Sequence, residues 1–137
     1  MAERTDPAAE APDPQVNERV IAADLAAVAS ARSFVRDQCH AIGLEPNLCD
    51  TVVLLTSEVV TNAILHADSE ARLRVRGNQH QLRVEVADDN SRHPQPQAAD
   101  PDALDGRGLA IVDMLAARWG VDEDPAGKTV WFEVQAA

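Results

Sequence analysis

The sequence predicts an α+β fold, a two-layer sandwich in which helices cover one face of a mixed, largely antiparallel sheet. Apolar residues recur with a helical period through residues 25–67, and the period changes to two from residue 72 onward, as it does in strands. The Gly77-Asn78 pair between two alternating runs indicates a hairpin, which builds antiparallel pairing. Because each helix carries an apolar stripe, the helices should pack together on one face of the sheet.

Length and composition indicate a single domain. The chain has 137 residues, of which 45% are hydrophobic and 26% charged, as in an ordinary globular protein. We expect one domain over residues 16–137, preceded by a disordered tail at 1–15 that is rich in Ala, Pro and acidic residues. The net charge of -11 argues against binding to nucleic acid or to an anionic membrane surface, and it is compatible with a basic protein partner.

The first half of the chain contains a short strand and two helices. Residues 20–22 are typical of an edge strand. Asp24 is a suitable N-cap for a helix over Leu25–Ile42, and Gly43 is a natural C-cap. Pro46 opens a second helix that continues to Ala67, since proline is tolerated in a first turn.

Cysteine usage and the lack of a leader sequence indicate the compartment. Cys39 and Cys49 lie in helical patterns without CxxC spacing, which favours two reduced, buried thiols. The N-terminus is acidic and proline-rich, unlike a signal peptide, and we expect no transmembrane segment. The expected location is the cytoplasm.

The second half of the chain alternates regular structure with loops. In order it predicts strands at 72–76 and 82–86, a polar loop at 88–105, a helix at 109–118, and a final strand or two ending with 130–134. Gly120 is expected to close the helix. A loop as long as 88–105 within a compact domain is usually functional or mobile.

Two polar residues interrupt the apolar helix that ends at Ala67. Glu58 and Asn62 lie one turn apart on a strip bordered by leucines. A carboxylate among apolar neighbours is costly unless it has a partner or a task. The task could be to accept a proton, and the amide is a suitable oxygen ligand for a hard cation. Alternatively, both residues merely satisfy neighbouring backbone groups.

Three further motifs are ambiguous when taken singly. Asp88, at a strand end, could accept a hydrogen bond from an amino group or simply begin a turn. The sequence Gly106-Arg107-Gly108 before a helix could present backbone N–H groups to a phosphate or act as a hinge. Gly127-Lys128-Thr129 resembles part of a P-loop, but Asp122 stands where the first glycine would be and a strand follows.

The order of these motifs resembles the GHKL ATPase superfamily, which includes gyrase, the histidine kinases and MutL. The stretches SEVVTNAILHA, GRGLAIVDMLAARWGV and GKTVWFEV look most like the small stand-alone anti-sigma-factor serine kinases of bacterial partner-switching systems. The resemblance covers residues 20–134. It implies ATP and Mg²⁺ as cofactors.

The resemblance also implies a role for individual residues. Glu58 would be the general base and Asn62 the protein ligand of Mg²⁺. Asp88 would bind the adenine amino group, and Thr129 would lie at the base of the adenine pocket. His66 would face the phosphates.

The remaining residues of the implied site form its lid. Gly106, Arg107 and Gly108, with Leu109 beside them, would make the mobile lid and its phosphate-facing turn. The family pattern Asp-x-Gly-x-Gly is altered here, because Asn90 and Arg92 replace the two glycines after Asp88. The loss of both glycines could narrow the nucleotide pocket or weaken affinity.

Two functions follow from this resemblance. In the first, the protein is a Ser/Thr protein kinase that phosphorylates an anti-anti-sigma partner and otherwise sequesters a sigma factor, with a homodimer plausible. In the alternative, it is a non-catalytic partner-switching module that keeps the fold and has weak or lost ATP binding. A third interpretation, an unrelated α+β domain with a structural Glu and Asn, explains each motif but not their order.

Overall fold

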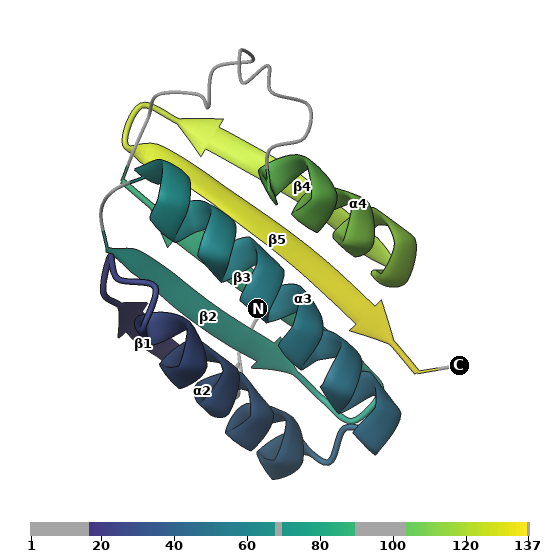
Figure 1. The fold of residues 1–137 in the computed structure, drawn as a ribbon. Helices are drawn as coiled ribbons and strands as arrows, with labels where there is room; N and C mark the ends of the chain where they lie inside the picture. The colour runs from purple at the N-terminus through teal and green to yellow at the C-terminus, as the bar shows by residue number, and fades with distance from the viewer. Residues whose placement is uncertain (1–16, 68–69, 90–103, 137) are drawn as a thin grey trace, which may run out of the picture.

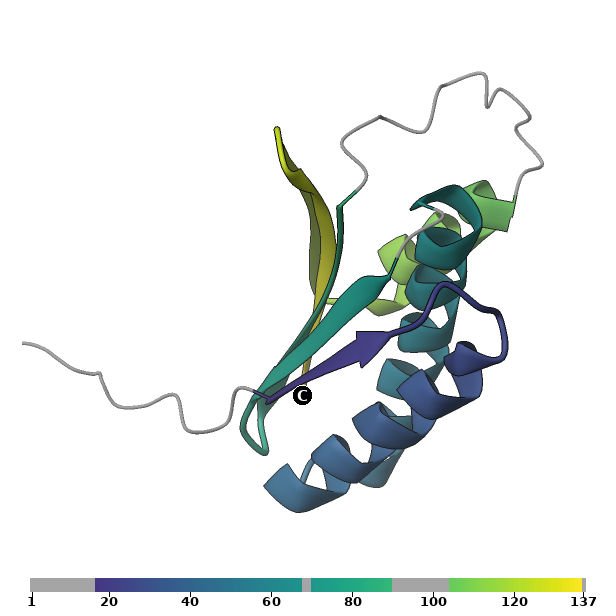
Figure 2. The same ribbon diagram turned by 90° about the vertical axis from the view of Figure 1, so that its left-hand side faces the viewer.

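A computed structural model of the chain describes residues 17–67, 70–89 and 104–136. Its elements in chain order are β1 (Asn17–Ile21), α2 (Ala27–Ile42), α3 (Pro46–Ala67), β2 (Ala71–Gly77), β3 (Gln81–Asp88), α4 (Leu104–Leu115), β4 (Arg118–Asp124) and β5 (Gly127–Gln135). The five strands form one sheet in the order β1-β2-β3-β5-β4, and every neighbouring pair in it is antiparallel. The three helices cover one face of this sheet (Figures 1 and 2). The predicted α+β sandwich is confirmed, and the expected tail at residues 1–15 lies outside the described part of the chain.

The core lies between the sheet and the helices. Strand side chains alternate between the two faces, and those on the helix side are fully buried: Ile21, Leu73, Val75, Leu82, Val84, Val86, Phe132 and Val134. With only two Phe and no Tyr in the chain, aliphatic side chains fill most of this layer. None of the helices that the structure describes lies over the opposite face of the sheet (Figure 2).

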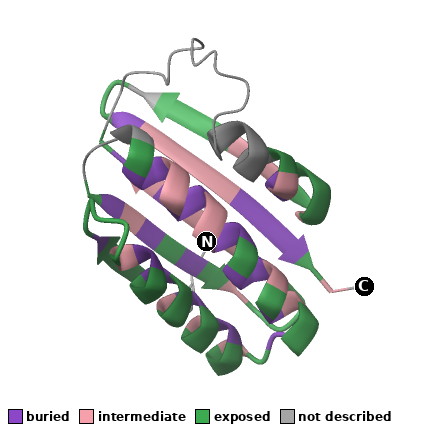
Figure 3. Cartoon of the chain, in the orientation of Figure 1, coloured by how far each residue is buried: buried purple, intermediate pink, exposed green. Residues whose placement is uncertain are grey.

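Helix α3 is the central element of the helical layer and lies between α2 and α4 (Figure 1). Its apolar side is buried as expected, with Val52, Leu55 and Val60 fully inaccessible. Leu54 and Leu65 remain 43% and 45% exposed, so the helix is enclosed on fewer sides than its composition suggests (Figure 3).

The stretch Pro46–Leu65 of α3 has a mean hydropathy of 1.5 and is long enough to cross a membrane. This differs from the expectation that no segment reaches that length. Half of the stretch is buried within the fold, as in the core helix of a soluble protein.

Helix α2 has the predicted end and a later start. The chain leaves α2 at Gly43, whose left-handed φ of 76° allows Leu44 N–H to donate to Cys39 O at 3.0 Å. The helix begins at Ala27 instead of Leu25. Asp24 still organises the entry, because its Oδ1 accepts the N–H of Ala26 at 2.9 Å.

The predicted hairpin is confirmed, and its loop is three residues long. The Oδ1 atom of Asn78 accepts the backbone N–H groups of His80 at 2.8 Å and Gln81 at 3.0 Å. This side chain therefore replaces a backbone acceptor within the turn. A Cβ at Gly77 would collide with the carbonyl oxygen of Gln81, which explains the glycine.

The predicted end of the third helix is wrong. Helix α4 stops at Leu115, and Arg118–Asp124 is a full edge strand, β4. Gly120 lies within β4 opposite Trp131, and a Cβ there would approach the indole ring to 2.9 Å. The glycine makes room for a tryptophan on the next strand and does not end a helix.

Candidate functional site

The predicted site residues gather at one end of the sandwich. The C-terminal end of α3, the end of β3, the first turn of α4 and the β4–β5 turn all lie there (Figure 1). The antiparallel order brings this about, because β3 ends where β5 begins and Asp88 pairs with Lys128. Segments far apart in the sequence therefore meet at one edge.

Asp88 is the last residue of β3 and is 2% exposed. It continues the row of Val84 and Val86, whose side chains are buried against the helices, so its carboxylate also lies on the helix side of the sheet. A carboxylate so deeply buried needs hydrogen-bonding partners or a function. Its burial is unlike that of a residue that only begins an exposed turn.

Gly127 approaches the backbone of Asp88 more closely than any other residue type could. A Cβ at this position would collide with the Asp88 carbonyl oxygen and would lie 2.9 Å from the Cα of Asp89. Its φ of 155° is also a conformation that L side chains rarely adopt. The strand ends are thus packed backbone to backbone around Asp88.

Asp89 points to the opposite face of the sheet. Its Oδ1 lies 3.0 Å from Nη1 of Arg72, which belongs to the outer row of β2. The side chains of Arg72 and Asp89 are 41% and 64% exposed, so solvent screens the pair and it contributes little to stability. The contact nevertheless holds the Asp89 side chain on the face of the sheet that is turned away from the helices.

Glu58 and Asn62 are both half-buried on α3, one turn apart. They lie on the same strip as the exposed Leu54 and Leu65. Within the described residues, neither side chain has a hydrogen-bond or ion-pair partner. This disfavours the interpretation that they serve neighbouring backbone groups. A carboxylate and an amide are thus left available to a ligand.

Thr129 does not share a face with Asp88. The register pairs Thr129 with Ala87 and Asp122, whereas Asp88 pairs with Lys128. Because Phe132 is fully buried on the helix side, alternation places Lys128 on that side and Thr129 on the outer face. The structure therefore does not bring Thr129 to the base of a pocket that contains Asp88.

Lys128 is the residue of this segment that the sequence analysis missed. It is the only lysine in the chain and lies between Asp88 on β3 and Glu123 on β4 in the same cross-strand row. The alternation of β5 already contains this signal: counting back in twos from the apolar Phe132 reaches Lys128.

Gly106, Arg107 and Gly108 lie inside α4, not before it, because the helix begins at Leu104. The acidic Asp105 favours a helix start upstream of the glycines. Each glycine within a helix costs about 1 kcal/mol relative to alanine, so the first turns of α4 have low intrinsic stability. The side chains of His66, Arg107 and Leu109 lie outside the described residues.

Comparison with known protein families identifies the fold. The family model described as "Histidine kinase-like ATPase domain" matches residues 21–134. No curated protein matches the chain.

Solved structures give the same result. A structure of the RsbU and RsbW domains of Rv1364c from Mycobacterium tuberculosis superposes with a TM-score of 0.66 at 19% identity, covering 88% of this chain and 32% of that one. The blue-light activated histidine kinase of Erythrobacter litoralis EL346 superposes with a TM-score of 0.53 at 26% identity, covering 80% and 41%. The histidine kinase AdeS of Acinetobacter baumannii gives 0.51 at 9% identity, covering 87% and 67%. The chain thus spans about a third of the length of the first structure and 41% of the second.

Proposed function

Because this chain belongs to the histidine kinase-like ATPase family, we propose that it is an ATP-binding regulatory protein of the anti-sigma serine-kinase type. The observation that carries the proposal is the buried Asp88 at the end of β3, with Gly127 packed against its backbone. This arrangement supports recognition of the amino group of a nucleotide base, because the packed strand ends hold the Asp88 carboxylate in a fixed position. In adenine, this donor is the exocyclic amino group at C6.

The residues available on α3 fit the phosphate end of the site. The Asn62 amide oxygen is a hard ligand of the kind that Mg²⁺ accepts alongside phosphates and waters. When bound, Mg²⁺ would neutralise charge on the phosphates. His66, Arg107 and the backbone of Gly106, Gly108 and Leu109 would complete this end, since they belong to the segments that meet there.

Glu58 would act as the general base. It lies one turn before Asn62 on the same strip, so a hydroxyl placed near a phosphate held by Asn62 would be within its reach. A carboxylate without a partner among the described residues can accept a proton without first breaking an ion pair. The acceptor would be a Ser or Thr hydroxyl of a partner protein.

One of the solved structures supports a proposal for the partners. One solved structure with this fold contains an RsbW domain. We propose that the present chain phosphorylates an anti-anti-sigma partner and sequesters a sigma factor when that partner is absent. A cytoplasmic location and a homodimer belong to the same proposal. The net charge of -11 is compatible with a basic surface on the partner.

A second candidate function is a non-catalytic partner-switching module. It is favoured by the altered segment after Asp88, where Asp89 is paired with Arg72 on the outer face and Asn90 and Arg92 replace glycines. Such a protein would exchange partners through the same fold without transferring phosphate.

Calorimetric titration of the purified protein with ATP, with and without Mg²⁺, tests the proposal. We expect Mg²⁺-dependent binding that is lost in Asn62→Ala and in Asp88→Asn. Binding that is unchanged in both variants would refute the site. If folded protein gives no heat at millimolar ATP, the non-catalytic module becomes the better account.

A further inference from the structure

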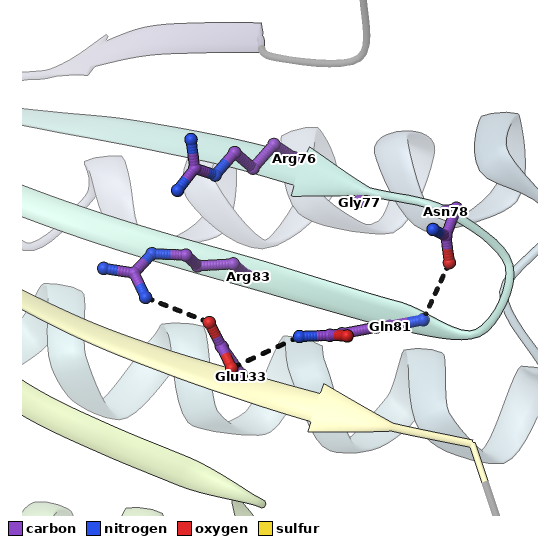
Figure 4. Close-up of a pocket in the computed structure, with 6 residues that line it drawn as sticks. All are labelled: Arg76, Gly77, Asn78, Gln81, Arg83 and Glu133. Carbon is purple, nitrogen blue, oxygen red and sulfur yellow. Dashed lines mark hydrogen bonds and ion pairs between the residues drawn. The ribbon is translucent and has the colours of Figure 1, made fainter. Parts of the chain in front are cut away.

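The helix-free face of the sheet carries a pocket that lies apart from the site described above. It has a volume of about 270 Å³ and is lined by Arg76, Gly77, Asn78, Gln81, Arg83 and Glu133 (Figure 4). Arg76 and Gly77 end β2, whereas Asp88 lies at the other end of the neighbouring strand. The pocket is therefore at the opposite end of the sheet and on the opposite face.

One wall of the pocket is held rigidly by ion pairs. The Glu133 carboxylate is 5% exposed and accepts hydrogen bonds from Arg118 at 2.8 and 2.9 Å and from Arg83 Nη1 at 3.0 Å. Arg83 also donates through Nε to Glu85 at 2.7 Å and stacks on Trp131, with its Cζ 4.1 Å from the ring centroid. Contacts on three sides fix the direction of the Arg83 guanidinium.

The other cation of the pocket is available. Arg76 is exposed, and no ion pair or hydrogen bond connects it to any part of the chain that the structure describes. Its side chain extends over the same face as those of Arg83 and Glu133 (Figure 4). The Asn78 amide also has donors to spare, because only its oxygen is used by the turn.

Charge and hydrogen-bond capacity together define the ligand. Two guanidinium groups and one carboxylate give the pocket a net charge of +1, and its unused groups are mainly donors. A single carboxylate matches both properties, since guanidinium groups bind carboxylates through paired N–H donors. A phosphate dianion fits less well, because it carries two negative charges where a carboxylate carries one, and the extra charge would lie close to the Glu133 carboxylate.

The surroundings indicate a polypeptide as the source of this carboxylate. Five of the eight arginines whose side chains the structure describes lie on the helix-free face, namely Arg72, Arg74, Arg76, Arg83 and Arg118. Four of them are ion-paired with carboxylates of the same face, those of Asp89, Glu85 and Glu133, and Arg76 is the one without such a pair among the described residues. Trp131 lies among these arginines, and Trp and Arg are the residues most often found at the energetic centre of protein interfaces. This surface is much wider than the pocket and continues along the strands, as an extended segment requires.

We propose that the helix-free face binds an acidic segment of a partner protein, with a Glu or Asp side chain of that segment seated between Arg76 and Arg83. This inference does not depend on ATP binding, because no residue of the pocket belongs to the nucleotide site. It gives the protein a second recognition surface on the face opposite to its helices.

The test is fluorescence anisotropy with a labelled synthetic peptide that alternates Glu with Ser, titrated with the full-length protein at low salt. The matched peptide with Gln in place of Glu should not bind. Arg76→Gln should weaken binding at least about fivefold. This variant should keep the wild-type melting temperature, because Arg76 has no partner among the described residues to lose. Arg36→Gln on α2 removes the same charge far from the pocket and should leave binding unchanged.

Several outcomes would overturn the proposal. Equal losses in Arg76→Gln and Arg36→Gln would show a general charge effect, and absence of binding would exclude the site. Competition by free glutarate as effective as by the peptide would make this a small-molecule site. Self-association that Arg76→Gln abolishes, measured by sedimentation, would assign the pocket to a second copy of the chain.

Discussion

Asp88 and Lys128 face each other across the β3–β5 pair, and both belong to the row of residues on the helix-covered side of the sheet. This relationship places a cation opposite the buried carboxylate that we propose as the adenine-binding residue. Glu123 on β4 stands on the other side of Lys128 in the same row. The lysine thus has an acidic residue on each neighbouring strand.

Lys128→Gln is expected to weaken ATP binding by roughly threefold to tenfold, because it removes the positive charge that faces Asp88, the proposed adenine-binding carboxylate, across the β3–β5 pair. Lys128→Arg should retain most of the affinity, since it keeps the charge. Calorimetry on both variants measures the difference. Equal affinities for wild type and Lys128→Gln would show that Lys128 has no part in the site.

Glu58→Gln is expected to preserve ATP binding and abolish phosphoryl transfer. The substitution retains the shape of the side chain and removes its ability to accept a proton. Labelled ATP and a candidate Ser-containing partner provide the assay, and calorimetry confirms that the variant still binds. Unchanged turnover would exclude Glu58 as the base.

Gly127→Ala is expected to lower the free energy of unfolding by about 2 kcal/mol, because its Cβ would collide with the Asp88 carbonyl. Gly43→Ala is a suitable control. Its left-handed φ of 76° is also unfavourable for alanine, but its Cβ would meet nothing closer than 4.0 Å. Urea denaturation should show the larger loss at Gly127, and the reverse order would contradict the close packing of the two strand ends.

Glu133 should make stability depend on pH in the acidic range. Burial acts to raise the pKa of Glu133, but hydrogen bonds from Arg118 and Arg83 outweigh it, and the pKa is lowered from its ordinary value. The unfolded chain then binds the proton more readily. The stabilisation is therefore complete above the ordinary Glu pKa and is lost as pH falls through the lowered value.

Glu133→Gln should consequently destabilise the fold by about 2 kcal/mol at pH 7, because two guanidinium groups lose their shared carboxylate. The difference from wild type should shrink below about pH 4. Thermal unfolding across this range measures it. A constant difference at all pH values would show that the ionised form of Glu133 is not what stabilises the sheet.

The thiols should be protected from alkylation. Both cysteines are free and buried, as expected from the sequence, and burial with the neighbouring Cys49 raises the pKa of Cys39 to about 12. At pH 8 the Cys39 thiol therefore stays protonated and inaccessible. Its reaction with iodoacetamide should follow unfolding of the protein, and rapid labelling of the folded protein would contradict this environment.

The sequence by itself determined the fold class and most of the elements. Hydrophobic period distinguished α2 and α3 from β2 and β3, because burial of one face requires apolar residues at the spacing of the secondary structure. Asn78 and Gly43 identified a turn and a helix end, since each conformation depends on one local residue. The order of Glu58, Asn62 and Asp88 identified the family.

The tertiary structure alone decided which side chains meet. Gly120 follows an apolar helical pattern and looks like a helix end. A glycine is needed there because a Cβ would meet the Trp131 ring on the neighbouring strand. Lys128 and Thr129 are adjacent in sequence, and only the pairing with Asp88 shows which of them faces the helices. Register and cross-strand contact depend on residues distant in the chain, so no local pattern contains them.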